Sequence, residues 1–184
     1  EKEYQKVIAE KEKTAWEIRS TLFGLRDSAA IPFGKAYDYA KEAGVRTGVR
    51  PALILAILTQ ESNLGENVGS CYLRDLSTGA GIGKNTGKVF QKVMKAPRDT
   101  DPFQTITQAL GISWQAAPVS CPQASGYGGA MGPSQFIPST WMLYRDSLSG
   151  LTNETFPDPW NARTAIFATA MLMRDNGADE NTRT

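Results

Sequence analysis

The longest apolar run of the chain, residues 51–58, leads directly into the polar residues Gln60 and Glu61. Its letters are PALILAIL, and proline suits the first position of a helix because its ring already holds a helical φ. A helix that is apolar nearly all round is typical of a buried one, and this run is too short to cross a membrane. We therefore expect it to form the central buried helix of the domain, with Ile54 and Glu61 on one face.

Prolines, glycines and Asp-Pro pairs mark the other helices. Pro32 suits a first turn, whereas Gly44 and Gly177 suit helix ends. The Asp-Pro pairs at 101–102 and 158–159 combine an N-cap with a proline at the first helical position. Apolar and polar side chains do not alternate convincingly, so we expect an all-α fold with at most a small hairpin within residues 66–85. The predicted helices are residues 31–43, 51–61, 87–95, 101–111, one starting near residue 138, and 158–177.

The first 28 residues differ from the rest in being rich in Glu and Lys, with apolar side chains at helical spacing. Residues 1–28 are predicted to form an amphipathic helix. Two interpretations stay open: the end of an upstream coiled coil with a partner helix, or a helix packed on the domain of residues 29–184. Because the sequence starts at Glu1 without a methionine or signal peptide, we expect a longer chain with any targeting segment upstream.

The chain contains no histidine, which excludes several chemistries. Ser-His-Asp and Cys-His nucleophile systems need an imidazole, as do histidine-ligated metal sites. Two cysteines alone cannot build a four-ligand zinc site, so no metal is predicted. No phosphate-binding glycine motif is present, and a net charge of +1 lacks the basic character of nucleic-acid-binding proteins. Proton transfer in an enzyme of this composition would depend on carboxylates, Lys or Tyr.

Cys71 and Cys121 flank a long polar segment rich in Gly, Asn and Ser. We expect a disulfide between them that closes an insert of residues 71–121, and such a bond would place the protein outside the cytoplasm. Two free buried thiols are the alternative, because sequence does not fix their separation.

Glu61 lies at the end of the most apolar helix, just before the sequence Ser62-Asn63-Leu64-Gly65. Burial and the negative end of the helix dipole would both favour its protonated form, which suits a general acid near neutral pH. The alternative is a solvated glutamate at the frayed end of an ordinary helix.

Three motifs in order resemble those of lysozyme-like lytic transglycosylases of the membrane-bound B type. They are Glu61-Ser62, the loop GGAMGPSQFIPSTW of residues 128–141, and the segment FPDPWNARTAIFATAMLMRDNGA of residues 156–178. Together they cover roughly residues 31–178. The resemblance implies a helical goose-lysozyme or SLT-type domain, peptidoglycan glycan strands as substrate, and no cofactor. A continuation beyond the last helix, bearing a Tyr, would be expected in that family.

The resemblance also implies the roles of individual residues. Glu61 would be the single acid and base, cleaving the MurNAc–GlcNAc β-1,4 bond to give 1,6-anhydro-MurNAc. Glycine in the loop lets the backbone approach a sugar closely, while an amide such as that of Gln135 both donates and accepts. Aromatic rings can stack on sugars, although Phe136 and Trp141 could equally be core residues. The predicted substrate-binding residues are Ser62, Tyr127, Gly129, Ala130, Met131, Gln135 and Phe136.

Other functions remain open from the sequence. Glu66 and Asp75 are the nearest acids after Glu61. Either could act as a second carboxylate, which would give a hydrolase of the goose-lysozyme type. A peptidoglycan-binding module without activity, or a structural part of an envelope machine, would not need Glu61. The insert of residues 71–121 is expected to form a wall of the glycan groove.

Overall fold

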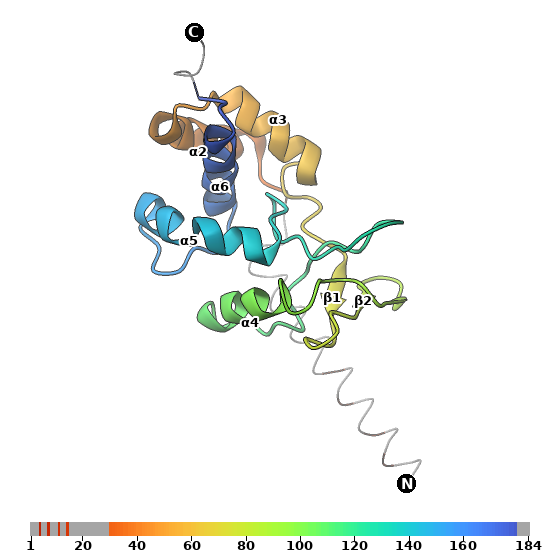
Figure 1. The fold of residues 1–184 in the computed structure, drawn as a ribbon. Coiled ribbons are helices and arrows are strands. Elements are labelled where there is room, and N and C mark those ends of the chain that lie inside the picture. The colour runs from red at the N-terminus through yellow and green to blue at the C-terminus, as the bar shows by residue number, and fades with distance from the viewer. Residues whose placement is uncertain (1–3, 5–6, 8–10, 12–13, 15–29, 180–184) are drawn as a thin grey trace.

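The computed structural model describes Tyr4, Val7, Lys11, Thr14 and residues 30–179. Within the latter range the chain is mainly helical, with one small sheet (Figure 1). The predicted N-terminal helix of residues 1–28 falls almost entirely outside the described residues. It stays a prediction, as does the coiled-coil partner. None of the described helices is both long enough and apolar enough to span a lipid bilayer. The elements are α2 Phe33–Thr47, α3 Pro51–Ser62, β1 Cys71–Leu73, β2 Gly81–Gly83, β3 Val89–Phe90, α4 Thr100–Ala109, α5 Pro138–Thr152 and α6 Ala162–Asp175.

The central helix of the domain is α6, and α3 packs beside it. Helix α6 contacts α2, α3 and α5, and every residue from Thr164 to Met171 is buried (Figure 1). The prediction that α3 is the central buried helix is therefore wrong. Helix α3 buries Ile54, Leu55 and Leu58, but its outer face carries small residues such as Ala56 that tolerate exposure.

Helix α2 runs four residues past its predicted end. Gly44 lies inside the helix, where a Cβ would stand 2.7 Å from the carbonyl oxygen of Val49. Glycine at position 44 lets the backbone of Val49 come close to the helix, and it does not end the helix. The helix ends at Gly48, whose φ of 77° is left-handed and whose N–H donates to the Gly44 carbonyl.

The predicted starts of α3 and α5 are confirmed, since Pro51 and Pro138 stand in their first turns. The predicted cap of α6 is wrong. Asn161 caps this helix by accepting a hydrogen bond from the Thr164 N–H at 3.1 Å, whereas Asp158 accepts one from the Trp160 N–H in the preceding turn.

The insert contains the small sheet, which lies with α4 on the opposite side of α5 from α2 and α3 (Figure 1). Its strands run in the order β1-β2-β3, each pair antiparallel, with Tyr72 opposite Ile82 and Ile82 opposite Val89. The hairpin expected within residues 66–85 is confirmed. The helix predicted at residues 87–95 is wrong, because Val89–Phe90 adds the third strand instead. The predicted Cys71–Cys121 disulfide is present.

Candidate active site

Glu61 stands at the C-terminal end of α3, where the chain turns sharply. The next residues Asn63, Leu64 and Gly65 all have left-handed φ values of 51°, 54° and 85°. The hydroxyl of Ser62 accepts a hydrogen bond from the Gly65 N–H at 2.9 Å and donates one to the Leu58 carbonyl at 3.3 Å. This turn leaves Glu61 exposed at the rim of the helix end. The burial expected for its carboxyl is not found in the free domain.

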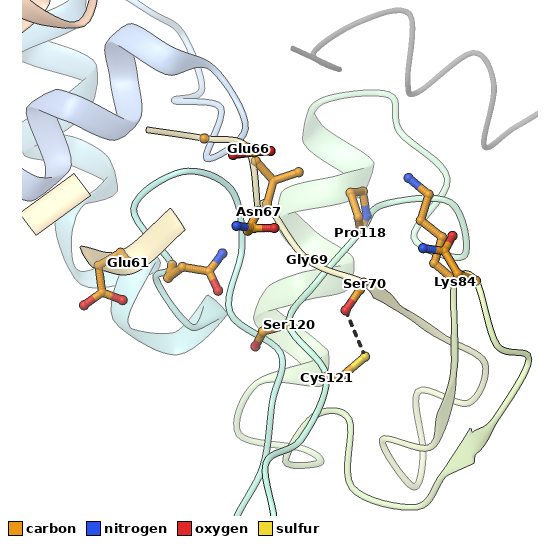
Figure 2. Close-up of a pocket in the computed structure, with 13 residues that line it drawn as sticks. Glu61, Glu66, Asn67, Gly69, Ser70, Lys84, Pro118, Ser120 and Cys121 are labelled. Carbon is orange, nitrogen blue, oxygen red and sulfur yellow. Dashed lines mark hydrogen bonds between the residues drawn. The ribbon is translucent and has the colours of Figure 1, made fainter. Parts of the chain in front are cut away.

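A cleft of about 510 Å³ runs from Glu61 toward the insert (Figure 2). We call it the first lobe. Its wall on the α3 side is the chain that follows the helix, and its far wall comes from the insert and the strand-like segment before Cys121. The lining residues are Glu61, Gln135, residues 65–70, Lys84, Asn85, Pro118, Ser120 and Cys121.

A second cleft of about 480 Å³ adjoins the first, and we call it the second lobe. It is lined by Gln60, Gln123, Ser125, Tyr127 and Ala130 in addition to four residues that also line the first lobe. Those shared residues are Glu61, Ser120, Cys121 and Gln135. Because they share these residues, the two lobes form one continuous groove, and Glu61 lies where they meet. An extended polymer could pass through such a groove on both sides of the carboxylate.

Gln135 is held beside this junction by an unusual backbone. Its φ of 53° is left-handed, which is uncommon for a residue with a side chain and is typical of functional sites. Its Nε2 donates to the Gly132 carbonyl at 2.7 Å, which fixes the side chain across its own turn. Gly132 has no room for a side chain, because a Cβ would lie 1.9 Å from the Pro159 oxygen. The turn is therefore pressed against the segment that leads into α6.

The neighbouring Ser134 anchors this turn to the central helix. Its hydroxyl donates to the Ala165 carbonyl, and the Thr169 hydroxyl donates to it at 2.9 Å. Both partners lie on α6, and all three residues are buried. The position of Gln135 is thus tied to the most buried helix of the domain.

The predicted substrate-binding residues divide into two groups. Gln135, Ala130 and the exposed Tyr127 line the groove together with Glu61. The other four do not line either lobe, for the following structural reasons. Met131 is fully buried, and Phe136 packs edge-on against Trp141 and Tyr144 in the core. Gly129 is buried against Met94, and Ser62 shapes the end of α3.

The disulfide joins the insert to the groove. Cys121 lines both lobes, while Cys71 is buried in β1 and exchanges two backbone hydrogen bonds with Val119. Ser120 then forms three hydrogen bonds with the loop of residues 128–141, which we call the motif loop. One of them runs from the Ser120 N–H to the Ala130 carbonyl at 2.8 Å. The insert thus supplies a wall of this groove, with Lys84, Asn85, Pro118, Ser120 and Cys121 among the lining residues. That the groove holds glycan stays a prediction.

The two acids considered as second carboxylates lie in different surroundings. Glu66 lines the first lobe and accepts a hydrogen bond from the Asn63 amide. Asp75 lines neither lobe. The hydroxyl of Ser77, then that of Thr78, donates to the Asp75 carboxylate and lowers its pKa below the usual range. Asp75 therefore serves a local turn.

Sequence reasoning missed several groove residues. Ser120 and Asn67 belong to loops without any motif. Lys84 belongs to the glycine-rich stretch GAGIGKNTG of residues 79–87, whose spacing does not match a phosphate-binding loop. That Gly-rich stretch was the available signal, because it supplies the β2–β3 turn at the groove. Within the described part of the chain, no three acidic, Cys or His side chains gather as a metal site would require.

Comparisons with known proteins give the family and the fold. The family model for the transglycosylase SLT domain matches residues 7–183. A direct comparison with characterised protein sequences finds no match.

Two lytic transglycosylases with solved structures share the fold. The Escherichia coli lytic transglycosylase Slt35 in complex with calcium is 18% identical with a TM-score of 0.55, over 89% of this chain and 49% of that one. Soluble lytic transglycosylase SltB1 from Pseudomonas aeruginosa is 20% identical with a TM-score of 0.53, over 89% of this chain and 48% of that one. This chain thus spans about half the length of these proteins.

Proposed function

Because the chain belongs to the transglycosylase SLT domain family, we propose that it is a lytic transglycosylase that cleaves the glycan strands of peptidoglycan. The observation that carries this proposal is the position of Glu61 at the junction of the two lobes. Sugar rings bound in both lobes would bring the glycosidic bond between them to this carboxyl. A cell-wall substrate and a disulfide both favour a location outside the cytoplasm.

The proposed reaction uses Glu61 twice. As an acid, it gives its proton to the oxygen that links MurNAc to GlcNAc, and the C1–O bond breaks with development of positive charge at C1. As a base, the resulting carboxylate takes the proton of the MurNAc 6-hydroxyl, whose oxygen then bonds to C1. The products are a free 4-hydroxyl on GlcNAc and a 1,6-anhydro-MurNAc end. Glu61 returns to its starting state, and no water is consumed.

The groove supplies groups that could bind the sugars around this bond. The Gln135 side chain is held in place by Gly132, and its amide oxygen accepts no hydrogen bond from the described part of the chain. Tyr127, exposed in the second lobe, offers a ring on which a sugar face can stack. A strand bound in the groove would also exclude water from the reacting bond beside Glu61.

A hydrolase is the second candidate, because Glu66 lines the same lobe as Glu61. In an inverting mechanism a second carboxylate would activate a water molecule, and the products would be reducing ends. The contact between Glu66 and Asn63 favours a structural role for Glu66 in the turn after α3. The two functions differ in a product that can be measured.

The test is mass spectrometry of purified peptidoglycan after digestion with the wild-type protein, Glu61→Gln and Glu66→Gln. We expect 1,6-anhydro-muropeptides from the wild type and from Glu66→Gln. The rate for Glu61→Gln should fall by a factor on the order of 10² to 10⁴, because general acid–base catalysis is lost. Reducing-end products that vanish in Glu66→Gln would instead establish the hydrolase. Binding without any product would make the domain a peptidoglycan-binding module.

A further inference from the structure

Lys84 occupies the end of the first lobe that is farthest from Glu61 (Figure 2). It lies in the turn between β2 and β3, within the insert. Its backbone N–H donates to the Ser70 carbonyl at 2.7 Å, and Ser70 itself lines the lobe. The backbone of Lys84 is thus fixed at the groove wall, although its side chain is exposed.

The charge of Lys84 is not neutralised by any side chain in the part of the chain that the structure describes. No acidic side chain in the described residues forms an ion pair with it, since the ion pairs there join Arg98, Arg145, Arg163 and Arg174 to carboxylates. Among the described residues that line either lobe, Lys84 is the one that carries a positive charge. The Asn85 amide beside it adds a neutral donor, whereas the Ser70 hydroxyl donates to the Cys121 sulfur at 3.4 Å. This end of the lobe can therefore receive an anion.

The acids of the groove lie at its other end. Glu61 and Glu66 line the lobe close to the end of α3, and Figure 2 shows both of them away from Lys84. A neutral glycan chain would need no cation at such a distance from the scissile bond. A substrate that carries carboxylates could form an ion pair with a cation at this place.

If the proposed function is correct, the substrate has this property. Peptidoglycan carries peptide stems on the lactyl groups of MurNAc, and these stems bear free carboxylates. We propose that Lys84 and its neighbours form a subsite for the peptide stem, in which the Lys84 ammonium pairs with a stem carboxylate. The insert then binds the peptide, while α3 and the loop of residues 128–141 bind and cleave the glycan.

The experiment measures binding in the Glu61→Gln background, so that no strand is cut. One probe is glycan strands with native stems, and the other is the same strands with their stem carboxyls converted to primary amides. Adding Lys84→Gln should weaken binding of native strands about two- to fivefold, as for loss of an exposed ion pair, and should leave binding of amidated strands unchanged. The difference should shrink at higher ionic strength.

Lys88→Gln is the matched control. Lys88 lies in the same turn, but its ammonium stands 5.2 Å from the centre of the Phe90 ring and it lines neither lobe. The Glu61→Gln protein that also carries Lys88→Gln should bind both probes as tightly as Glu61→Gln alone. Equal weakening of both probes by Lys84→Gln, or no weakening of the native one, would overturn the peptide subsite while leaving the proposed function standing. Absence of binding to either probe before Lys84 is changed would refute both proposals.

Discussion

Single buried hydroxyls decide where Gln135 stands in the groove. Ser134 immediately precedes Gln135 in the chain. Its hydroxyl accepts a hydrogen bond from the Thr169 hydroxyl and donates one to the Ala165 carbonyl, and both partners lie on α6. Thr169→Val keeps the shape of the side chain but removes the donor, so the turn loses one of its two anchors. We expect kcat to fall by roughly tenfold with little change in KM, because a displaced Gln135 misaligns the reacting groups. Steady-state kinetics on glycan strands would measure this.

Two variants control this prediction. Thr169→Ser keeps the hydroxyl and should recover most of the activity. Thr107→Val removes a buried hydroxyl that bonds only within α4, and should cost stability of about 1 kcal/mol without an effect on kcat. Because the effect is transmitted by Gln135, Thr169→Val should change kcat little when Gln135→Ala is already present. Full additivity of the two substitutions would show that Thr169 does not act through Gln135.

At the level of elements, an ion pair connects α2 to the central helix α6. The Arg163 guanidinium donates to both oxygens of Glu42, with an Nε–Oε2 distance of 2.9 Å. This hydrogen bond holds the pKa of Glu42 below its usual value of 4.5. A carboxyl with a lowered folded pKa stabilises the protein above its unfolded pKa, and that contribution disappears as pH falls through the folded value.

Glu42→Gln should therefore lower the unfolding free energy at pH 7 by at most about 1 kcal/mol, because the pair is partly exposed. The difference in unfolding free energy between the wild type and Glu42→Gln should disappear as the pH falls below 4.5. Denaturant unfolding at a series of pH values measures both effects. Asp146→Asn breaks the exposed Arg145–Asp146 pair on α5 and should have almost no effect at any pH. A gap for Glu42→Gln that persists in acid would mean that packing, not charge, is lost.

The elements also show what sequence can and cannot predict. Proline at the first turn correctly located α3 and α5, because this signal depends only on local backbone geometry. Gly44 misled the prediction of α2, because the reason for a glycine there is the Val49 backbone, which is remote information. The order of burial between α3 and α6 was likewise unpredictable, since hydrophobicity does not say which helix has neighbours on all sides.

The candidate site shows the same division. Glu61, Tyr127, Ala130 and Gln135 could be proposed from motifs, and the structure brings them together at one groove. Met131 and Phe136 belong to the same motif but serve the core, because a motif does not separate residues that touch substrate from those that support them. On the insert side of the groove, the glycine-rich stretch of residues 79–87 was the one signal available from the sequence. The segment of residues 118–121 offered none, since it meets the loop of residues 128–141 through tertiary pairing such as that between Ser120 and Ala130.

At the scale of the whole molecule, the groove lies between a helical part and the insert. Helix α3 supplies Glu61, the loop before α5 supplies Gln135, and the insert supplies the opposite wall. Backbone pairing of residues 118–121 and the disulfide tie the insert wall to β1 and to the loop of residues 128–141. Side-chain hydrogen bonds add to these links, such as the one from the Ser139 hydroxyl to the Asp99 carboxylate at 2.6 Å. The disulfide is thus one of several links that hold this wall of the groove in place.

Removing this link should affect both stability and function. The disulfide joins residues 50 positions apart, so the double variant Cys71→Ala and Cys121→Ala should lower the unfolding free energy by about 2–4 kcal/mol. Cleavage should also slow at temperatures where the variant is fully folded, because Cys121 lines both lobes and its segment would lose its fixed position. Urea unfolding and cleavage rates on the same samples would separate the two effects. A fully folded variant that cleaves at the wild-type rate would limit the disulfide to a stabilising role, and the backbone pairing of Val119 with Cys71 would then be sufficient to hold the wall.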